Sequence, residues 1–137
     1  MHNLENNNIE EKDRVTNEIN KLFSKLKNVV YLHDNVVVIE NVALVGVNGW
    51  YNVNANSENE NLNLKIHQYA DLAYLHKTIE KLQLHVDVKK IIIISSSIPS
   101  PSFYFGESTS KDEMYPINAL SNDTEGKISH WFFGTYN

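Results

Sequence analysis

The feature that most constrains the fold is a run of four isoleucines at residues 91–94, preceded by Lys89 and Lys90. A short apolar run of β-branched residues is typical of a buried strand. A helical pattern at 64–84 comes before it, and a helix followed by a buried strand is half of a βαβ crossover. The sequence therefore predicts an α/β fold: a mixed sheet with flanking helices.

Two amphipathic helices are predicted, because apolar residues recur at helical spacing in two stretches. The first covers 9–27, with acidic residues near its start and lysines near its end, as the helix dipole favours. The second covers 64–84. The expected apolar stripes are Ile9, Val15, Ile19, Leu22, Phe23 and Leu26 on the first helix, and Ile66, Tyr69, Ala70, Ala73, Ile79 and Leu82 on the second.

Short runs rich in valine and isoleucine predict the other strands. Three lie close together, at 29–32, 35–40 and 42–46, and favour an antiparallel meander. The last strand is predicted at 128–133, and the pattern allows a short helix at 116–120. The intervening segments are expected to be loops: a glycine-shaped turn at 46–52, a mobile asparagine-rich surface loop at 54–63 and a long loop at 95–122.

Length and composition exclude several classes of protein. The 137 residues suffice for a single domain over 1–137, and the absence of cysteine excludes disulfides, thiolate zinc sites and thiol chemistry. The net charge of −5, with Arg14 as the one arginine, speaks against nucleic-acid binding. The sequence has neither a membrane-length apolar run nor a signal peptide, so we expect a cytoplasmic protein with no membrane partner.

Histidines and acidic residues are the first candidates for a metal site. His67, His76 and His85 are nine residues apart, so neighbours point to opposite faces of a helix and cannot share an ion. We expect them to be surface or core histidines. Glu107, Asp112 and Glu113 could bind a hard cation, although a solvated loop is the favoured interpretation.

The sequence also gives little support for a serine nucleophile or for a nucleotide-binding site. Ser95, Ser96 and Ser97 follow the isoleucine strand, where α/β folds place ligand-binding loops, but no GxSxG motif surrounds them. Neither GxGxxG nor GxxxxGK[ST] occurs. Aromatic residues such as Trp50 and Trp131 could stack on bases, but core packing is favoured without a basic groove.

Three segments resemble the C-terminal half of the calcineurin-like metallophosphoesterase family. Residues 91–100, with sequence IIIISSSIPS, are similar to its apolar strand followed by Thr-His-His-Ala-Pro-Ser. The closing WFFGTYN resembles its strand followed by Gly-His-Thr-His, and VALVGVNGWY at 42–51 is similar to a strand and turn of phage and bacterial members. This resemblance implies half of a two-sheet sandwich, with strands 91–94 and 128–133 as neighbours.

The resemblance also implies that the metal ligands are lost. Ser96 and Ser97 stand at one histidine motif, and Thr135 and Asn137 stand at the other. Neutral hydroxyl and amide groups bind paired divalent cations poorly. We therefore expect no catalytic residues, no cofactor and no metal site.

The favoured hypothesis is a non-catalytic, truncated metallophosphoesterase-like protein that regulates or inhibits through protein–protein contact. A half-sandwich leaves an edge or an apolar face uncovered, so a protein partner or self-association is expected. The alternative is a divergent metal-dependent phosphodiesterase or phosphatase that uses His2, Asn48, Ser96 and Asn137. A nucleic-acid-binding module is the least favoured hypothesis.

Overall fold

The computed structural model describes the backbone of residues 2–48, 58–100 and 116–134, and their side chains except at 2–12 and 58–64. The chain divides into two units, Met1–Tyr31 and Leu32–Asn137. The first unit contains α1 (His2–Ser24). The second contains the sheet with the remaining helices, and the prediction of a single domain over 1–137 stays a prediction.

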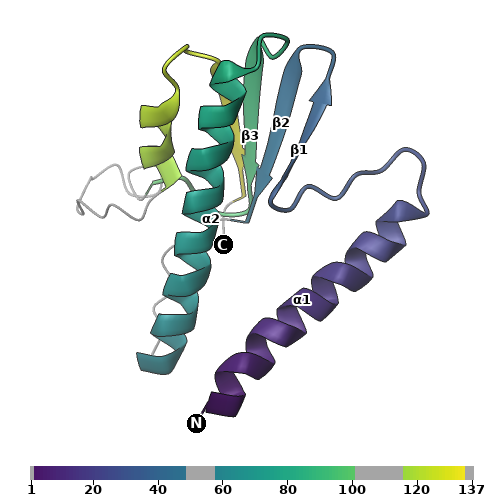
Figure 1. Ribbon diagram of the computed structural model, residues 1–137, viewed down its shortest axis with the longest axis vertical. Coiled ribbons are helices and arrows are strands. Elements are labelled where there is room, and N and C mark those ends of the chain that lie inside the picture. Colours follow the sequence, from purple (N-terminus) through teal and green to yellow (C-terminus); the bar gives the residue numbers. More distant parts are fainter. Residues whose placement is uncertain (1, 49–57, 101–115, 135–137) are drawn as a thin grey trace. The chain divides into compact units, whose positions relative to one another are not determined.

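A four-stranded mixed sheet forms the centre of the second unit (Figure 1). Its strand order is β1-β2-β3-β4, in which β1 and β2 are antiparallel and the other neighbours are parallel. The predicted mixed α/β fold and the crossover into the isoleucine strand are therefore confirmed. The elements in chain order are β1 (Asn35–Ile39), β2 (Val42–Val47), α2 (Glu58–Leu84), β3 (Lys90–Ser95), the 3-10 helix η1 (Pro116–Asn122) and β4 (Ile128–Phe133).

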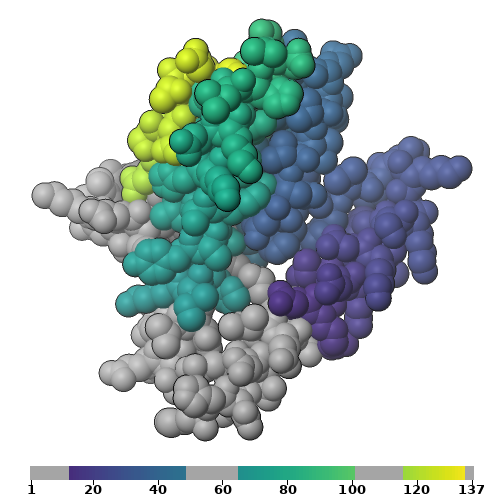
Figure 2. Space-filling model, in the orientation of Figure 1, coloured from purple at the N-terminus to yellow at the C-terminus, as the bar shows by residue number. Residues whose placement is uncertain are grey.

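One face of the sheet carries the core. Ala43, Val45 and Val47 of β2 and Ile91 and Ile93 of β3 alternate onto this face and are buried. Both crossover segments pack there, since α2 and η1 contribute buried side chains to the same cluster, and Figure 2 shows them side by side. From the two helices and their connections, the cluster includes Leu75, Ile79, Leu82, Val88 and Ala119.

The apolar stripe predicted for the second helix is wrong in its first half. Ile66, Tyr69, Ala70 and Ala73 are exposed, whereas Leu72 and Leu75 are buried. Both sets have helical spacing, so periodicity does not choose between them. The sheet lies against the side of α2 that carries Leu75 and Ile79, and this contact decides which set is buried.

The predicted strand at 29–32 is also wrong, because this segment has no regular secondary structure. Gly46 shows the reason: a Cβ there would lie 2.6 Å from the Cβ of Leu32 and 2.8 Å from its carbonyl carbon. The chain at Leu32 therefore packs against the face of β2 instead of pairing along an edge. Of the predicted loop at 54–63, residues 58–63 belong to α2, and 54–57 lie outside the described residues.

Smaller differences concern the ends of elements. The predicted helix 9–27 is α1, which begins at His2 and ends at Ser24. The last strand is confirmed with its predicted bounds, and the short helix predicted at 116–120 is η1, which extends to Asn122. Residues 49–52 of the predicted turn lie outside the described part of the chain.

Lys127 connects the start of β4 to the end of α2. Its ammonium donates hydrogen bonds to the carbonyl oxygens of Leu82 (2.9 Å), Gln83 (2.9 Å) and His85 (3.0 Å). The last carbonyls of a helix have no intrahelical partner, and a cation beside them also favours the negative end of the helix dipole. Lys127 therefore caps α2 from a distant point in the sequence.

We predict that Gly46→Ala lowers the free energy of unfolding by about 1–3 kcal/mol, the usual cost of overpacking. The added methyl group would meet the backbone of Leu32, which has no rotamer with which to move away. Urea denaturation followed by circular dichroism measures the change. An unchanged midpoint would show that the segment at Leu32 is not packed against β2.

We predict that Lys127→Met lowers the free energy of unfolding by about 1–3 kcal/mol, because three carbonyl groups lose a charged donor. Lys90→Met is the matched control, since the Lys90 side chain is exposed and its loss should cost less than about 0.5 kcal/mol. Equal losses in the two variants in the same denaturation experiment would contradict the capping role.

Candidate functional site

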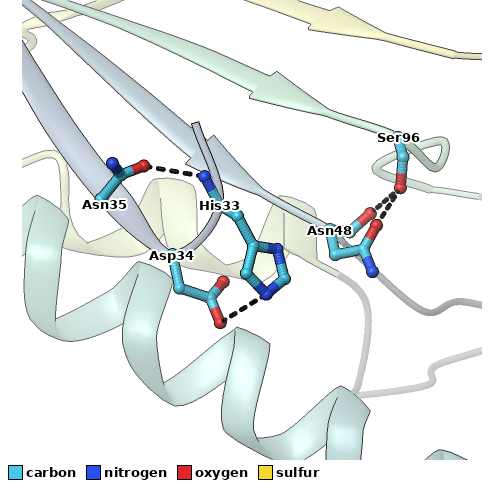
Figure 3. A network of polar contacts seen from close by, with 5 residues as sticks. All are labelled: His33, Asp34, Asn35, Asn48 and Ser96. Atoms are coloured by element: carbon cyan, nitrogen blue, oxygen red, sulfur yellow. Dashed lines mark hydrogen bonds and ion pairs between the residues drawn. The ribbon is translucent and has the colours of Figure 1, made fainter. Parts of the chain in front are cut away.

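The carboxyl ends of the parallel strands are the first candidate site, because ligands of open α/β sheets bind outside this edge. β2, β3 and β4 all end there, and the antiparallel β1 begins there. Figure 3 shows two groups of polar residues at this edge. One contains Asn48 and Ser96, and the other contains His33, Asp34 and Asn35.

Asn48 and Ser96 join the ends of β2 and β3. The Ser96 hydroxyl lies 2.7 Å from the Asn48 Oδ1 and is also hydrogen-bonded to the Asn48 backbone carbonyl, which accepts from the Ser96 amide at 3.2 Å (Figure 3). These contacts extend the pairing of the two parallel strands beyond their last ladder residues. The structure thus brings together two of the four residues of the enzyme hypothesis.

Ser95 makes the corresponding connection between β3 and β4. Its hydroxyl donates to the carbonyl of Ser97 (2.7 Å) and accepts from the Trp131 indole nitrogen (2.9 Å). The Gly134 amide donates to the Ser95 carbonyl (3.1 Å). A Cβ at Gly134 would lie 2.7 Å from the Ser96 carbonyl oxygen, so the two chain segments approach closely only because this residue is glycine.

These hydrogen bonds bear on whether a serine could act as a nucleophile. An activated serine needs a base within hydrogen-bond reach. The described partners of the Ser96 hydroxyl are the two oxygens of Asn48, and Ser95 is bonded to Ser97 and Trp131. Ser97 is buried. The arrangement can hold strand ends together, but it supplies no imidazole or carboxylate base to these hydroxyls.

His33, Asp34 and Asn35 shape the entry into β1. The Asn35 Oδ1 accepts a hydrogen bond from the His33 amide at 2.8 Å, and the His33 Nε2 lies 3.9 Å from the Asp34 carboxylate (Figure 3). Asp34 has φ 48°, a left-handed conformation that short polar side chains tolerate. The chain therefore makes a sharp turn at these residues and then enters β1, an edge strand of the sheet.

Two residues of α2, Tyr74 and Asp71, were not singled out from the sequence. Burial raises the pKa of the Tyr74 phenol; the Thr78 hydroxyl opposes this shift and the Asp34 carboxylate adds to it. Tyr74 therefore stays neutral at physiological pH. Asp71 is almost fully buried, and its spacing of four from Leu75 places it on the same helix face. This spacing is the sequence signal from which the burial of Asp71 could have been predicted.

The histidine pattern leads to no metal site within the described residues. No group of three or more histidine, aspartate or glutamate side chains there could hold an ion. His76 instead connects α2 to η1: its Nδ1 lies 3.1 Å from the Asn122 Oδ1, and the Asn122 amide donates to the His76 carbonyl. His85 lies just beyond the end of α2.

Several candidate residues are not described by the structure. Glu107, Asp112, Glu113, Thr135 and Asn137 lie outside the described residues, as does Trp50. His2 begins α1, but its side chain is not described. The predictions about these residues therefore stay predictions.

A hollow of about 380 Å³ lies between η1 and β4. Its lining is mostly apolar and includes Ile117, Leu120, Trp131 and Phe133. The acidic residue that borders it, Asp123, is already engaged, since its carboxylate accepts from the amides of Lys127 (2.7 Å) and Ile128 (3.1 Å). The hollow offers apolar contact but no free acid or base from this residue.

The second face of the sheet is the other candidate site, and its character is apolar. Side chains that alternate away from the core lie there: Ile94 is 37% exposed and Phe132 is 57% exposed. The Phe132 ring stacks on the His130 ring, with centroids 6.0 Å apart. Within the described part of the second unit, both helical elements pack on the opposite face. Leu32 packs on this face at Gly46, and Leu44 and Ile92 are half-buried, whereas Ile94, His130 and Phe132 are exposed. We call the surface formed by Leu44, Ile92, Ile94, His130 and Phe132 the open face.

Comparison with known proteins found no match, either to a family model, to a curated protein or to a solved structure. The resemblance to metallophosphoesterases therefore stays a prediction. The adjacency of β3 and β4 that it required is present in the sheet. No helix among the described residues is long and apolar enough to cross a membrane.

Ile93 and Ile94 provide a matched test of the two sheet faces. We predict that Ile93→Ala lowers the free energy of unfolding by about 2–5 kcal/mol, because Ile93 is fully buried in the core. Ile94→Ala should cost distinctly less, since this side chain is partly exposed on the open face. Urea denaturation of both variants measures the difference, and equal losses would show that something covers the open face in solution.

Proposed function

We propose that this protein is non-catalytic and acts by contact with another protein, in a regulatory or inhibitory role. The observation that carries the proposal is the open face, where the exposed side chains of Ile94 and Phe132 are neighbours in the sheet. Contiguous exposed apolar surface on a folded domain is characteristic of protein interaction sites.

The chemistry of the strand ends supports the same proposal. Hydrolysis of a phosphate ester by paired cations needs carboxylate and imidazole ligands to hold the ions and to activate water. Ser96 stands where the resembled family has a histidine motif. In the described strand ends, its hydroxyl is hydrogen-bonded to the amide oxygen of Asn48. Their hydrogen bonds serve strand pairing, and both groups are neutral.

We further propose that the sheet derives from half of a metallophosphoesterase sandwich. Two features support this origin: β3 and β4 are parallel neighbours, and a βαβ crossover leads into β3. In a sandwich, a second sheet covers the inner face of the first. On this interpretation, the open face is the surface that a second sheet would have covered, and its apolar residues now make contact with a partner.

We predict that the purified protein hydrolyses bis-p-nitrophenyl phosphate no faster than buffer containing the same manganese, nickel or zinc salt. The physical reason is that neutral serine and asparagine groups cannot hold a pair of divalent cations at this edge. Release of p-nitrophenolate, followed by absorbance, measures the rate.

Variants make this measurement decisive. Ser96→Ala and Asn48→Ala remove the polar groups of the strand ends, and Ser121→Ala removes an exposed hydroxyl of η1 as a control. Metal-dependent hydrolysis that is lost in the first two variants and retained in the control would overturn the proposal. It would support the divergent phosphodiesterase instead.

A further inference from the structure

The first unit contains an apolar stripe whose spacing is stricter than an amphipathic helix requires. Val15, Ile19, Leu22 and Leu26 are separated by four, three and four residues. This alternation is the heptad spacing by which one helix packs along another. A helix that covers a sheet usually presents a wider apolar face, so the narrow stripe favours a helical partner.

The stripe is exposed along α1 and its last turn. Leu22 is 64% exposed and Leu26 is 51% exposed, Val15 is also exposed, and Ile19 is half-buried. The helix ends at Ser24, but the amides of Lys25 and Leu26 still donate to the carbonyls of Leu22 and Phe23. Lys25 and Leu26 therefore continue the helical turn.

The end of α1 is fixed by a contact within its own unit. The Tyr31 ring stacks on the Phe23 ring, with centroids 5.5 Å apart and planes 10° apart. Phe23 directly follows Leu22 of the stripe, so this stack supports one flank of the stripe. Most of the stability of a helix in a protein comes from packing its apolar side against a partner.

Charges beside the stripe select the direction of a helical partner. Glu18 precedes Ile19 and Lys25 precedes Leu26, so both charged residues lie on one flank. The residues that follow Val15 and Leu22 form the other flank, and these are Thr16 and Phe23. One flank therefore carries one charge of each sign, whereas the other carries none.

A parallel pair of such helices would place the charged flank of each against the uncharged flank of the other. An antiparallel pair places equivalent flanks together. Glu18 of one helix then lies beside Lys25 of the partner subunit, and Lys25 lies beside Glu18 of the partner subunit. In the same alignment, Leu22 packs beside the partner subunit's Ile19. The sequence of α1 is thus complementary to itself in the antiparallel direction.

We propose that α1 pairs antiparallel with α1 of a second copy of this chain, through the stripe Val15, Ile19, Leu22 and Leu26. The two Glu18–Lys25 pairs fix the direction. The inference goes beyond the proposed contact at the open face, because it adds a second contact, at α1, whose partner is a second copy of this chain.

Sedimentation equilibrium of the full chain, up to about 100 μM, tests the proposal because weak dimers are populated there. We expect a dimer whose dissociation constant rises on the order of a hundredfold in Leu22→Gln, since two leucines leave the interface. Ile94→Gln is the matched control on the open face and should leave the dimer intact.

Charge exchange tests the direction of the helices. Lys25→Glu should weaken the dimer about fivefold or more, because two attractive pairs become repulsive. Adding Glu18→Lys to the same chain should restore the wild-type dissociation constant. The double variant also loses the Arg14–Glu18 ion pair within α1, whose atoms lie 3.1 Å apart. Circular dichroism of each variant therefore shows whether α1 stays helical.

Three other outcomes would overturn the proposal, and each of them points to a different arrangement of α1. A monomer at all concentrations would exclude a second copy as the partner of α1. A monomer destabilised by Leu22→Gln would show that the stripe packs within its own chain. A dimer broken by Ile94→Gln but not by Leu22→Gln would assign the contact to the open face, and the proposed contact function would survive. Failure of that function would appear separately, in the hydrolysis assay.

Discussion

The parallel pairing of β3 with both of its neighbours is the constraint on which the second unit depends. Parallel strands cannot be joined by a tight turn, so the chain must cross over the sheet between β2 and β3 and again between β3 and β4. The described helices of the two crossings, α2 and η1, pack on the same face and bury Ile91 and Ile93. The same arrangement leaves Ile94 and Phe132 on the other face and brings the strand ends to one edge.

At that edge, polar residues serve strand pairing in a place where other α/β proteins bind ligands. Ser96 and Asn48 join β2 to β3, and Ser95 joins β3 to Trp131 of β4. A hydroxyl that bonds a neighbouring carbonyl satisfies a buried or half-buried acceptor, and this contributes to stability without any reaction. The position of this edge in the fold favours ligand binding, whereas the hydrogen bonds of its described side chains favour strand pairing.

Some of the fold could be predicted because local sequence and tertiary structure agree. The isoleucine run and residues 128–133 became β3 and β4, since β-branched and aromatic residues favour a covered extended chain. Residues 29–32 have the same composition but no partner edge, because Leu32 lies on Gly46. For the site, the sequence placed Ser96 at the end of a strand. It did not show that Asn48, across a long crossover, is the group bonded to Ser96.

The sequence by itself determined the helices, all four strands of the sheet and the lack of thiol chemistry, because these depend on local periodicity and composition. Only the tertiary structure decided which side of α2 is buried, how Lys127 caps it and which face of the sheet is left open. These properties depend on contacts between residues far apart in the chain. The two possible apolar stripes of α2 have the same helical period, and only the contact with the sheet decides which of them is buried.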